Sequence, residues 1–340
     1  RVYEDDGAWR FRFDRSKPVT FHDMICGDIT IDYRDASNTP DMAIRRADGS
    51  YIFHFVNVVD DIEMKMTHVI RGEDHIMNTP KHIQLFEAFG VTPPVFAHMP
   101  LILNQDGSKM SKRDVGAALG TYPEEGFLPE GVMNFLALLG WNPGTEQELF
   151  TMQELIDNFS LERVSKSGAR FQPDKAKWFN AQYMHRKTDA ELAEVYQPIL
   201  REHGIEVSDE VAGKAAGIMK ERAQLTTDLW DLTSYFFIAP TQYEEKQTRK
   251  YWKGDNPAIL RELRGVLEGI DDFSKENTER IVHAWIEEKG YGMGQVMNTL
   301  RLALVGAGKG PGMYDVTEFI GREETLRRID YLLDNLKPAE

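Results

Sequence analysis

The chain has 340 residues, 41% of them hydrophobic, which is enough for two to four small domains with real cores. Its formal net charge of −15, from 55 acidic and 40 basic residues, argues against a general nucleic-acid binder, because such proteins usually have a basic balance. No apolar run of about eighteen residues is present and Cys26 is the only cysteine, so the composition excludes a membrane-spanning helix, an internal disulfide and a zinc site of several cysteines, and predicts a cytoplasmic protein.

The first fifty residues predict short strands. Residues 9–13 alternate aromatic and basic side chains, and residues 26–31 also read as a strand. Alternation of this kind is typical of strands with one buried face. The sequence begins without a methionine or a helix cap, and we interpret it as part of something longer.

A mixed α/β segment is predicted over residues 51–103. Residues 51–59 form a near-continuous β-branched and aromatic run, which indicates a strand buried on both faces. A second strand is predicted at 67–71, a helix from Thr79 to the glycine at position 90, and a further strand at 99–103. Strand, helix and strand at this spacing predict a βαβ unit with parallel pairing.

Beyond residue 114 the sequence is almost entirely helical in pattern. Helices are predicted from Pro129 to Gly140 and at 190–203, 211–238, 258–269, 276–289, 294–304 and 322–336. Residues 121–160 contain seven carboxylates and no Lys or Arg, whereas residues 160–188 contain seven basic residues against two acidic ones. The basic stretch fits either a surface that follows a phosphate backbone or a solvated mixed surface, and charge alone leaves both open.

The chemistry is concentrated in residues 104–113, Asn-Gln-Asp-Gly-Ser-Lys-Met-Ser-Lys-Arg, directly after a predicted strand. Asp-Gly predicts a turn, and Lys109, Lys112 and Arg113 place three cations within five residues. A loop at the carboxyl end of a parallel strand is where such sheets bind ligands, and lysines there can neutralise a triphosphate. An isolated Lys-x-x-Lys would indicate only a lysine-rich surface turn. The complete Lys-Met-Ser-Lys-Arg motif at 109–113, directly after a predicted strand, is much more specific.

These residues carry a family resemblance. Residues 109–113 are similar to the second signature of class I aminoacyl-tRNA synthetases. Residues 57–61 and 69–80 resemble the glutamyl-tRNA synthetases of bacterial type, and residues 128–141 and 162–167 continue the match. The resemblance covers essentially the whole chain.

The resemblance implies a separate role for each of several residues at the active site. Lys109 and Lys112 match the catalytic, phosphate-stabilising lysines. Arg71 matches a residue that holds the substrate glutamate, as suits a guanidinium facing a carboxylate, and Asn57 and Phe53 line the same pocket. Phe53 stands where the family usually has a tyrosine, so it can only shape that pocket. The positions implied to contact ATP, which would arrive with Mg²⁺, are Asp74, Ile102, Lys109, Met110, Ser111, Lys112 and Arg113.

Other interpretations apply to the segment around Arg71. Residues 71–75, Arg-Gly-Glu-Asp-His, could be a surface cluster of ion pairs, or a metal site because His, Asp and Glu are adjacent. Adjacent side chains at the end of a strand point apart, which disfavours the metal site. No metal site is predicted for this chain, zinc included.

The resemblance also implies contacts with tRNA. Arg163, Ser165 and Lys166 match the stem-contacting region, and Arg301, Gly310, Pro311 and Tyr314 match the anticodon-reading helix and loop. Arginine can hydrogen-bond base edges and tyrosine can stack on a base. Gly310 stands where a threonine is expected. Residues 306–309 also hint at a phosphate loop, but no Ser or Thr follows the lysine and the preceding segment is helical.

The family's first signature, a His-containing phosphate-binding turn, is not found in the sequence. We therefore expect the C-terminal portion of a glutamyl-tRNA synthetase, inactive by itself, from a monomeric parent that uses ATP, L-glutamate and tRNA(Glu). A catalytically silent tRNA-binding module is the alternative, and the intact lysine loop argues against it. A glutaminyl-tRNA synthetase is disfavoured because the tail is helical where that enzyme has β-barrels. Whether tRNA(Gln) is also charged stays open.

The expected fold is α/β followed by all-α. It comprises the second half of a Rossmann-like parallel sheet, a helical stem-contact domain and two helical anticodon-binding subdomains. The expected boundaries are 1–46 for a remnant of the acceptor-arm insertion, 47–113 for the half sheet, 114–188 for the stem-contact domain, and 189–254 and 255–340 for the two subdomains.

Overall fold

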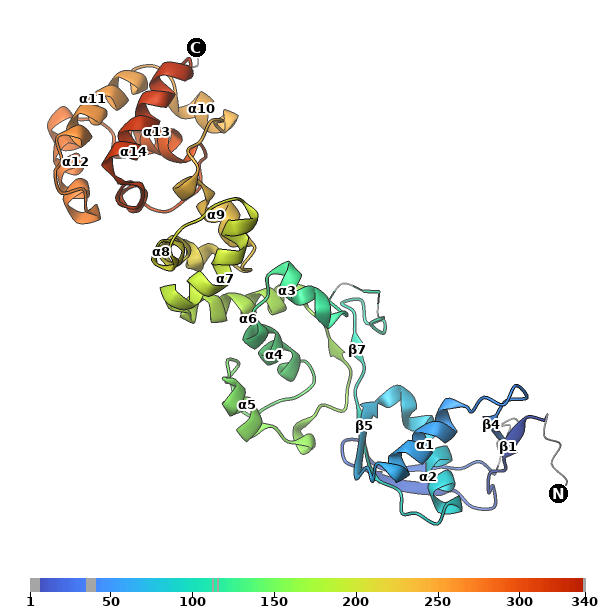
Figure 1. The fold of residues 1–340 in the computed structure, drawn as a ribbon. Helices are drawn as coiled ribbons and strands as arrows, with labels where there is room; N and C mark the ends of the chain where they lie inside the picture. Colours follow the sequence, from blue (N-terminus) through green and yellow to red (C-terminus); the bar gives the residue numbers. More distant parts are fainter. Residues whose placement is uncertain (1–6, 35–40, 112, 115, 339–340) are drawn as a thin grey trace. The chain divides into compact units, whose positions relative to one another are not determined.

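The computed structural model describes residues 7–34, 41–111, 113–114 and 116–338 (Figure 1). The chain divides into two compact units: unit 1 comprises residues 1–119 and 133–175, and unit 2 comprises residues 120–132 and 176–340. The described strands are β1 (Trp9–Phe11), β2 (Val19–Asp23), β3 (Gly27–Ile31), β4 (Met42–Arg45), β5 (His68–Gly72), β6 (Val95–Met99), β7 (Ile102–Leu103) and β8 (Ala169–Arg170).

A four-stranded mixed sheet is the centre of unit 1, in the order β3-β2-β6-β5. Strands β5 and β6 are parallel, β2 is parallel to β6, and β3 is antiparallel to β2. The strands expected at 9–13 and 26–31 are present as β1 and β3, whereas β2 and β4 were not predicted; β2 and β3 belong to this sheet. The sheet is therefore assembled from segments on both sides of the predicted boundary at residue 46.

The predicted βαβ unit is confirmed. Helix α2 (Thr79–Ala88) connects the parallel strands β5 and β6, with a proline in its first turn. Gly90, at φ +71°, adopts the left-handed conformation that commonly ends a helix. Ile83 is buried against Phe96 of β6, so the helix covers a face of the sheet.

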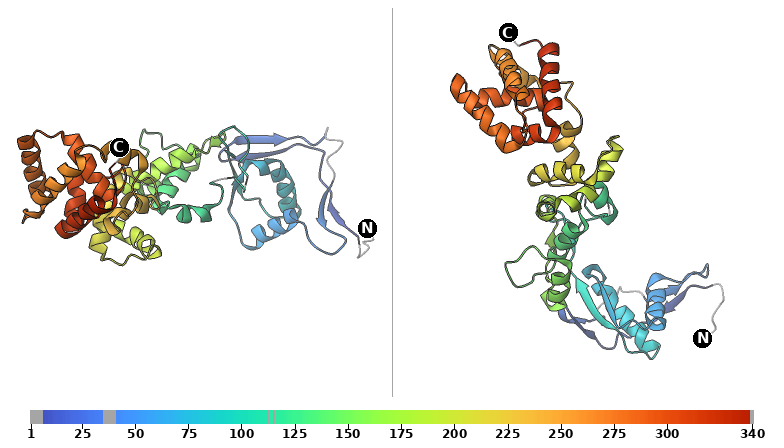
Figure 2. Two further views of the ribbon diagram at one scale, coloured as in Figure 1. Left: turned by 90° about the horizontal axis from the view of Figure 1, so that it is seen from above. Right: turned by 60° about the vertical axis from the view of Figure 1, so that its left-hand side comes forward.

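The strand predicted at 51–59 is wrong, because those residues begin helix α1 (Phe53–Glu63). Phe55, Val58 and Ile62 are spaced three and four residues apart and all pack into one core cluster with Phe86 of α2. That spacing places them on one helical face. The β-branched residues in this segment favour a strand locally, which led to the wrong prediction despite the helical spacing. Both views in Figure 2 place α1 and α2 together beside the sheet.

The strand predicted at 99–103 is wrong in its bounds, because the strand that follows α2 is β6 (Val95–Met99), which shares only Met99 with the prediction. β6 ends at Met99, and β7 begins at Ile102 after Pro100 and pairs in parallel with β8. A proline cannot donate a ladder hydrogen bond, which accounts for the break. The remainder of unit 1 packs around Trp141, Phe150 and Val164, which share a buried cluster with Ile25 and Ala97.

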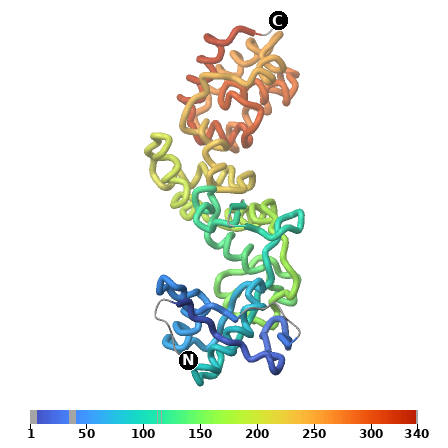
Figure 3. The backbone as a smooth tube through the Cα atoms, turned by 90° about the vertical axis from the view of Figure 1, so that its right-hand side faces the viewer, coloured from blue at the N-terminus to red at the C-terminus, as the bar shows by residue number. Residues whose placement is uncertain are grey.

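The helical tail is confirmed, and its path is traced in Figure 3. No strand follows β8 in the described residues. The helices beyond α2 are α3 (Tyr122–Glu125), α4 (Pro129–Leu138), α5 (Met152–Asn158), α6 (Pro173–Arg186), α7 (Asp189–Glu202), α8 (Asp209–Met219), α9 (Asp228–Phe237), α10 (Glu245–Tyr251), α11 (Asn256–Glu268), α12 (Lys275–Lys289), α13 (Met293–Val305) and α14 (Met313–Asn335).

The boundaries differ from the predicted ones in two informative places. The single helix predicted at 211–238 is divided into α8 and α9 by a 3₁₀ turn, Lys220–Arg222, and a loop. Helix α14 starts earlier than predicted but is broken at Gly321, whose φ of 78° and ψ of 170° are not helical. In the part of the chain that the structure describes, no helix has the length and apolar character needed to cross a membrane.

Candidate functional site

Arg71 lies near the carboxyl end of β5, where a parallel sheet presents side chains to a ligand. Its guanidinium donates four hydrogen bonds: Nε to His98 Nε2 at 3.2 Å, Nη1 to His82 Nδ1 at 3.3 Å, and Nη2 to Thr79 Oγ1 at 2.7 Å and to the His75 carbonyl at 3.5 Å. A guanidinium has five N–H groups, so one N–H, on Nη1, has no partner among the described residues.

The hydrogen-bond partners of Arg71 are all uncharged acceptors in this arrangement. Burial lowers the pKa of Arg71, and the carboxylates of Asp61 and Asp23 oppose that shift only through space. The guanidinium also lies over the ring of Phe96, 5.6 Å from its centroid. A half-buried cation without a directly bonded carboxylate is well suited to bind one from a ligand.

The other predicted glutamate contacts lie on α1, four residues apart on one side of the helix. Phe53 is 60% exposed and its ring packs edge-on against His54, whereas Asn57 is half-buried. Neither forms a hydrogen bond with Arg71 in the described part of the chain. The link from α1 to Arg71 runs through His54, whose Nδ1 lies 3.0 Å from His82 Nε2. Sequence reasoning missed both histidines, because no motif marks them.

The structure brings together two of the predicted ATP contacts. Lys109 Nζ donates to Asp74 Oδ2 at 2.7 Å, and both side chains are about half exposed. This hydrogen bond from Lys109 lowers the pKa of Asp74. Ile102 of β7 is 41% exposed and holds the loop by accepting a hydrogen bond from the Met110 N–H at 2.9 Å. The pairing places a cation and its counter-ion at the surface.

Carboxylates order the loop that carries Lys109: Asp106 Oδ1 accepts from the Ser108 N–H and hydroxyl at 2.9 and 2.6 Å, and Asp114 bonds across the base of the loop. Asp114 Oδ2 accepts from Asn104 Nδ2 at 3.0 Å and from the Ser111 N–H at 2.7 Å, which closes the loop across its base. The Arg113 N–H lies 3.3 Å from Ser111 Oγ. Lys112, a predicted catalytic residue, lies outside the described residues.

The predicted stem contacts lie in a short segment elsewhere in unit 1. The Ser165 N–H donates to the Gly140 carbonyl at 2.8 Å, and the Arg163 carbonyl accepts from the Asn142 N–H at 3.2 Å. These backbone bonds leave the side chains of Arg163 and Lys166 exposed. The segment is thus fixed by its backbone and presents two cations to solvent.

In unit 2, the predicted anticodon residues Arg301, Gly310 and Pro311 meet. Arg301 Nη2 donates to the Pro311 carbonyl at 2.7 Å, while its Nη1 is buried without a hydrogen-bond partner. Burial lowers the pKa of Arg301. Arg222 Nη1 donates to the Gly310 carbonyl at 2.7 Å. Arg222, which sequence reasoning missed because it stands in no motif, is therefore part of the same constellation.

Tyr314, the remaining predicted anticodon residue, is only 7% exposed on α14. Its hydroxyl is buried without a hydrogen-bond partner, and burial raises its pKa. Its ring packs at 5.7 Å from that of His283. In this conformation the ring is not available for stacking, and its assignment as a base-stacking residue stays a prediction.

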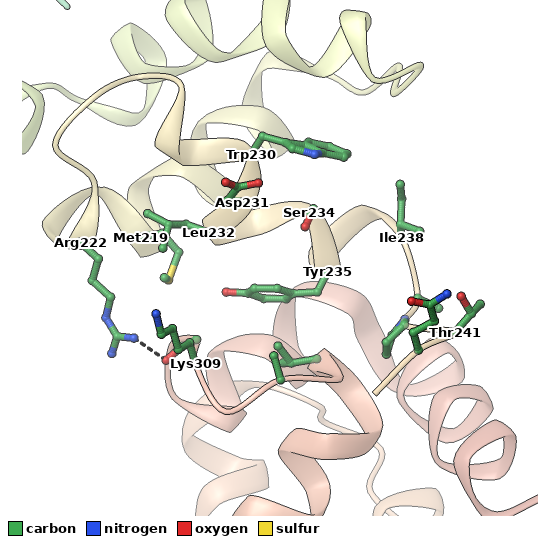
Figure 4. A pocket seen from close by; sticks show the side chains of 16 residues that line it. Met219, Arg222, Trp230, Asp231, Leu232, Ser234, Tyr235, Ile238, Thr241 and Lys309 are labelled. Carbon is green, nitrogen blue, oxygen red and sulfur yellow. Dashed lines mark hydrogen bonds between the residues drawn. The ribbon is translucent and has the colours of Figure 1, made fainter. Parts of the chain in front are cut away.

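A pocket of about 830 Å³ lies beside Gly310 in unit 2. Figure 4 shows the ring of Tyr235 near its centre, with the hydroxyl directed toward the side where Arg222 and Lys309 lie. Trp230 lies above this ring in the view of Figure 4 and also lines the pocket. Aromatic rings with nearby cations are the surface that binds unstacked nucleotides.

The described residues contain no group of three or more His, Cys, Asp or Glu side chains placed to hold a metal ion. Glu73 instead accepts a hydrogen bond from the Leu101 N–H at 3.2 Å, and Asp74 is paired with Lys109. Adjacent carboxylates in the 71–75 segment therefore have separate partners.

Comparison with known proteins gives matches over both units. Residues 3–178 match the family described as tRNA synthetases class I (E and Q), catalytic domain, and residues 190–333 match an anticodon binding domain. A glutamate–tRNA ligase of Akkermansia muciniphila is 59% identical over 332 residues, covering 97% of this chain and 75% of the relative. The corresponding enzyme of Phocaeicola vulgatus is 45% identical, covering 96% of this chain and 68% of the relative.

Two similar solved structures are also glutamate–tRNA ligases. A glutamate–tRNA ligase from Elizabethkingia meningosepticum, in complex with its amino acid, superimposes with a TM-score of 0.88 at 39% identity, covering 96% of this chain and 68% of that chain. The enzyme from Elizabethkingia anophelis gives a TM-score of 0.82 at 38% identity, covering 94% of this chain and 66% of that one.

These matches correct one prediction. The catalytic-domain match begins at residue 3, which contradicts the expectation of a C-terminal portion without the N-terminal signature segment. The expected inactivity depended on that interpretation and loses its basis with it.

Proposed function

The chain belongs to the class I tRNA synthetases for glutamate and glutamine, among the glutamate–tRNA ligases, and we propose that it ligates L-glutamate to tRNA(Glu) through a glutamyl-adenylate. A glutamate carboxylate attacks the α-phosphorus of ATP and pyrophosphate leaves. A terminal ribose hydroxyl of the tRNA then attacks the acyl carbon, and AMP leaves.

The observation that carries this proposal is the environment of Arg71. Its direct partners are two imidazoles, a hydroxyl and a carbonyl, so its charge is available to a carboxylate substrate. Asn57 and Phe53 on α1 are proposed to complete the glutamate pocket. Phe53 supplies only shape, because it lacks the hydroxyl expected at that position.

Binding of ATP is assigned to the loop after β7 and to the residues that face it. Lys109 would exchange its bond with Asp74 for the phosphates as charge develops on them, with Lys112 acting beside it. Ile102, Met110, Ser111 and Arg113 are proposed to frame the nucleotide. Mg²⁺ would enter as part of the MgATP substrate, held mainly by the phosphates.

Recognition of tRNA is proposed for the remaining segments. Residues 114–188 would contact the stem through Arg163, Ser165 and Lys166, whose backbone is fixed and whose cations are exposed. Residues 189–254 and 255–340 would form two anticodon-binding subdomains, with Arg301, Gly310, Pro311 and Tyr314 at the reading site. A monomer suffices for this arrangement.

Charging assays of the purified chain with tRNA(Glu) and tRNA(Gln) test the proposal. Glutamylation of tRNA(Glu) is expected, and charging of tRNA(Gln) would define the breadth of specificity. Lys112→Ala should lower adenylate formation by about 10²-fold, the scale of losing one preorganised donor. Lys17→Ala, at an exposed lysine of unit 1, is the matched control and should leave the rate unchanged. No glutamylation by a folded chain would refute the assignment.

A further inference from the structure

A buried pair, Asp23 and His98, lies behind Arg71. Both side chains are fully buried, and His98 Nδ1 lies 2.6 Å from Asp23 Oδ2. The other oxygen, Oδ1, accepts from the backbone N–H groups of Ile25 at 3.0 Å and Cys26 at 2.8 Å. Burial raises the pKa of Asp23, but these hydrogen bonds outweigh it and lower the pKa overall. Asp23 is thus a fixed acceptor on both oxygens.

The hydrogen bonds determine where His98 carries its proton. A guanidinium has donors and no acceptor, so the Nε–H of Arg71 must meet a lone pair on His98 Nε2. The single proton of the neutral imidazole is then on Nδ1, from which it is donated to Asp23. The identity of the residue at position 23 therefore controls what His98 presents to Arg71.

We infer that Asp23 is a positioning residue for the substrate-binding guanidinium: it fixes the His98 proton on Nδ1, and His98 then orients the plane of Arg71. This rests on the proposed function, in which Arg71 binds a glutamate carboxylate. Thr79 Oγ1 of α2 contacts both residues, at 3.1 Å from His98 Nε2 and 2.7 Å from Arg71 Nη2. Strands β2, β5 and β6 and helix α2 all contribute to holding one guanidinium.

Asp23→Asn is the decisive substitution because it keeps the shape of the side chain but replaces the acceptor that faces His98 Nδ1 with a donor. The carboxamide oxygen can still accept the backbone N–H groups of Ile25 and Cys26, which leaves its NH₂ group facing His98 Nδ1. That arrangement moves the His98 proton to Nε2, where it meets the Nε–H of Arg71 donor to donor. We expect glutamate affinity to fall about tenfold or more, since a hydrogen bond of a charged group is replaced by a repulsion.

The chain offers a matched control on β2 and its other neighbour in the sheet, β3. His22 Nδ1 lies 2.7 Å from Asp28 Oδ1, but these side chains are 71% and 80% exposed. Asp28→Asn makes the same chemical change in an Asp–His pair of similar length that does not touch Arg71. It should leave glutamate affinity at the wild-type value.

Two measurements on the full chain test the inference. Glutamate titration by calorimetry should show weaker binding by Asp23→Asn and unchanged binding by Asp28→Asn. Nitrogen-15 NMR of labelled histidines should show His98, assigned by the loss of its signals in His98→Gln, protonated on Nδ1 in the wild type and on Nε2 in Asp23→Asn.

Detection of the Nε2–H form in the wild type overturns the inference without any substitution, so a variant that fails to fold does not remove the test. Wild-type glutamate affinity in a folded Asp23→Asn protein also overturns it. A wild-type chain that binds no glutamate would instead count against the proposed function, and the protonation state of His98 is measured independently of that result.

Discussion

His82 is a buried neutral histidine in direct contact with a cation. It is 2% exposed, and burial, followed by the charge of Arg71 and the nearby His54, His75 and Lys81, lowers its pKa to about 3. Because Nδ1 accepts from Arg71, its proton is on Nε2 and points to His54. Protonation would put a second charge beside the guanidinium.

This predicts acid-sensitive stability. The folded pKa of His82 is below its ordinary value of 6.5, so the unfolded chain binds more protons between pH 6.5 and 3. The free energy of unfolding should therefore decrease as the pH falls through that window. Urea titrations at pH 7 and 5 should show a smaller decrease for His82→Gln than for the wild type. His22→Gln, at an exposed histidine, should keep the wild-type decrease, and an equal decrease in His82→Gln would contradict the assignment.

At the scale of single residues, the assignment of Arg71 to the ligand stays a prediction, and the side chains that support Arg71 were not predicted from the sequence. Arg71 was identified within a recognisable segment, as were Asp74 and Lys109, which the structure then pairs. Asp23 and His98 could not be predicted because they meet only through the pairing of β2 with β6, and no local pattern contains both. Side chains that act through another residue leave no short motif.

Among the elements, helix α14 contains a break whose cause is a single glycine. Gly321 has φ 78° and ψ 170°, a combination that only glycine adopts without strain. Gly265 lies inside α11 at ordinary helical geometry, and neither glycine has an atom within 4 Å of an added Cβ. The two positions therefore differ in backbone conformation and not in available space.

Opposite effects are predicted for the same substitution at these two sites. Gly321→Ala should lower the free energy of unfolding by about 1–3 kcal/mol, because a residue with a Cβ atom is strained at the φ and ψ angles of this position. Gly265→Ala should raise it by about 0.5–1 kcal/mol, because alanine loses less entropy in a helix. Thermal or urea unfolding of each variant gives the answer. Stabilisation by Gly321→Ala would mean that α14 is continuous in solution.

Element prediction succeeded where turns and spacing agreed. The α2 helix had a proline in its first turn and a glycine just after its end, and it was located within two residues. The α1 helix was mistaken for a strand because Val56, Val58 and Val59 favour strands locally, while packing of Val58 into the core decided the outcome. Tertiary burial overrode local preference.

At the scale of the whole molecule, the order of an α/β front and a helical tail could be predicted, because periodicity changes visibly near residue 114. The hydrogen bonds that connect distant helices within unit 2 could not be predicted. Arg328 of α14 is 3% exposed and its Nη1 donates to the Tyr235 carbonyl of α9 at 2.6 Å and to the Leu304 carbonyl of α13 at 2.8 Å. It is also paired with Glu324.

Removing that cation should destabilise unit 2 strongly. Arg328→Met leaves two carbonyls at helix ends without their donor and removes one of the two arginines bound to Glu324, and we expect a loss of about 3–5 kcal/mol. Arg327→Met is the matched control, since Arg327 binds the same Glu324 from a side chain that is 58% exposed, and it should change stability by less than about 0.5 kcal/mol. Equal losses in urea unfolding would show that the carbonyl contacts contribute little.

Arg328 also bears on whether the helical tail stays assembled after its backbone is cleaved between α10 and α11. Helix α9 belongs to the segment before residue 254, whereas α13 and α14 come after it, and the guanidinium bonds both groups. Trp252 adds a second tie, because its indole N–H donates to the Leu336 carbonyl at 2.8 Å. A protease that nicked the backbone between α10 and α11 would therefore yield two fragments that co-purify under native conditions and separate only in denaturant.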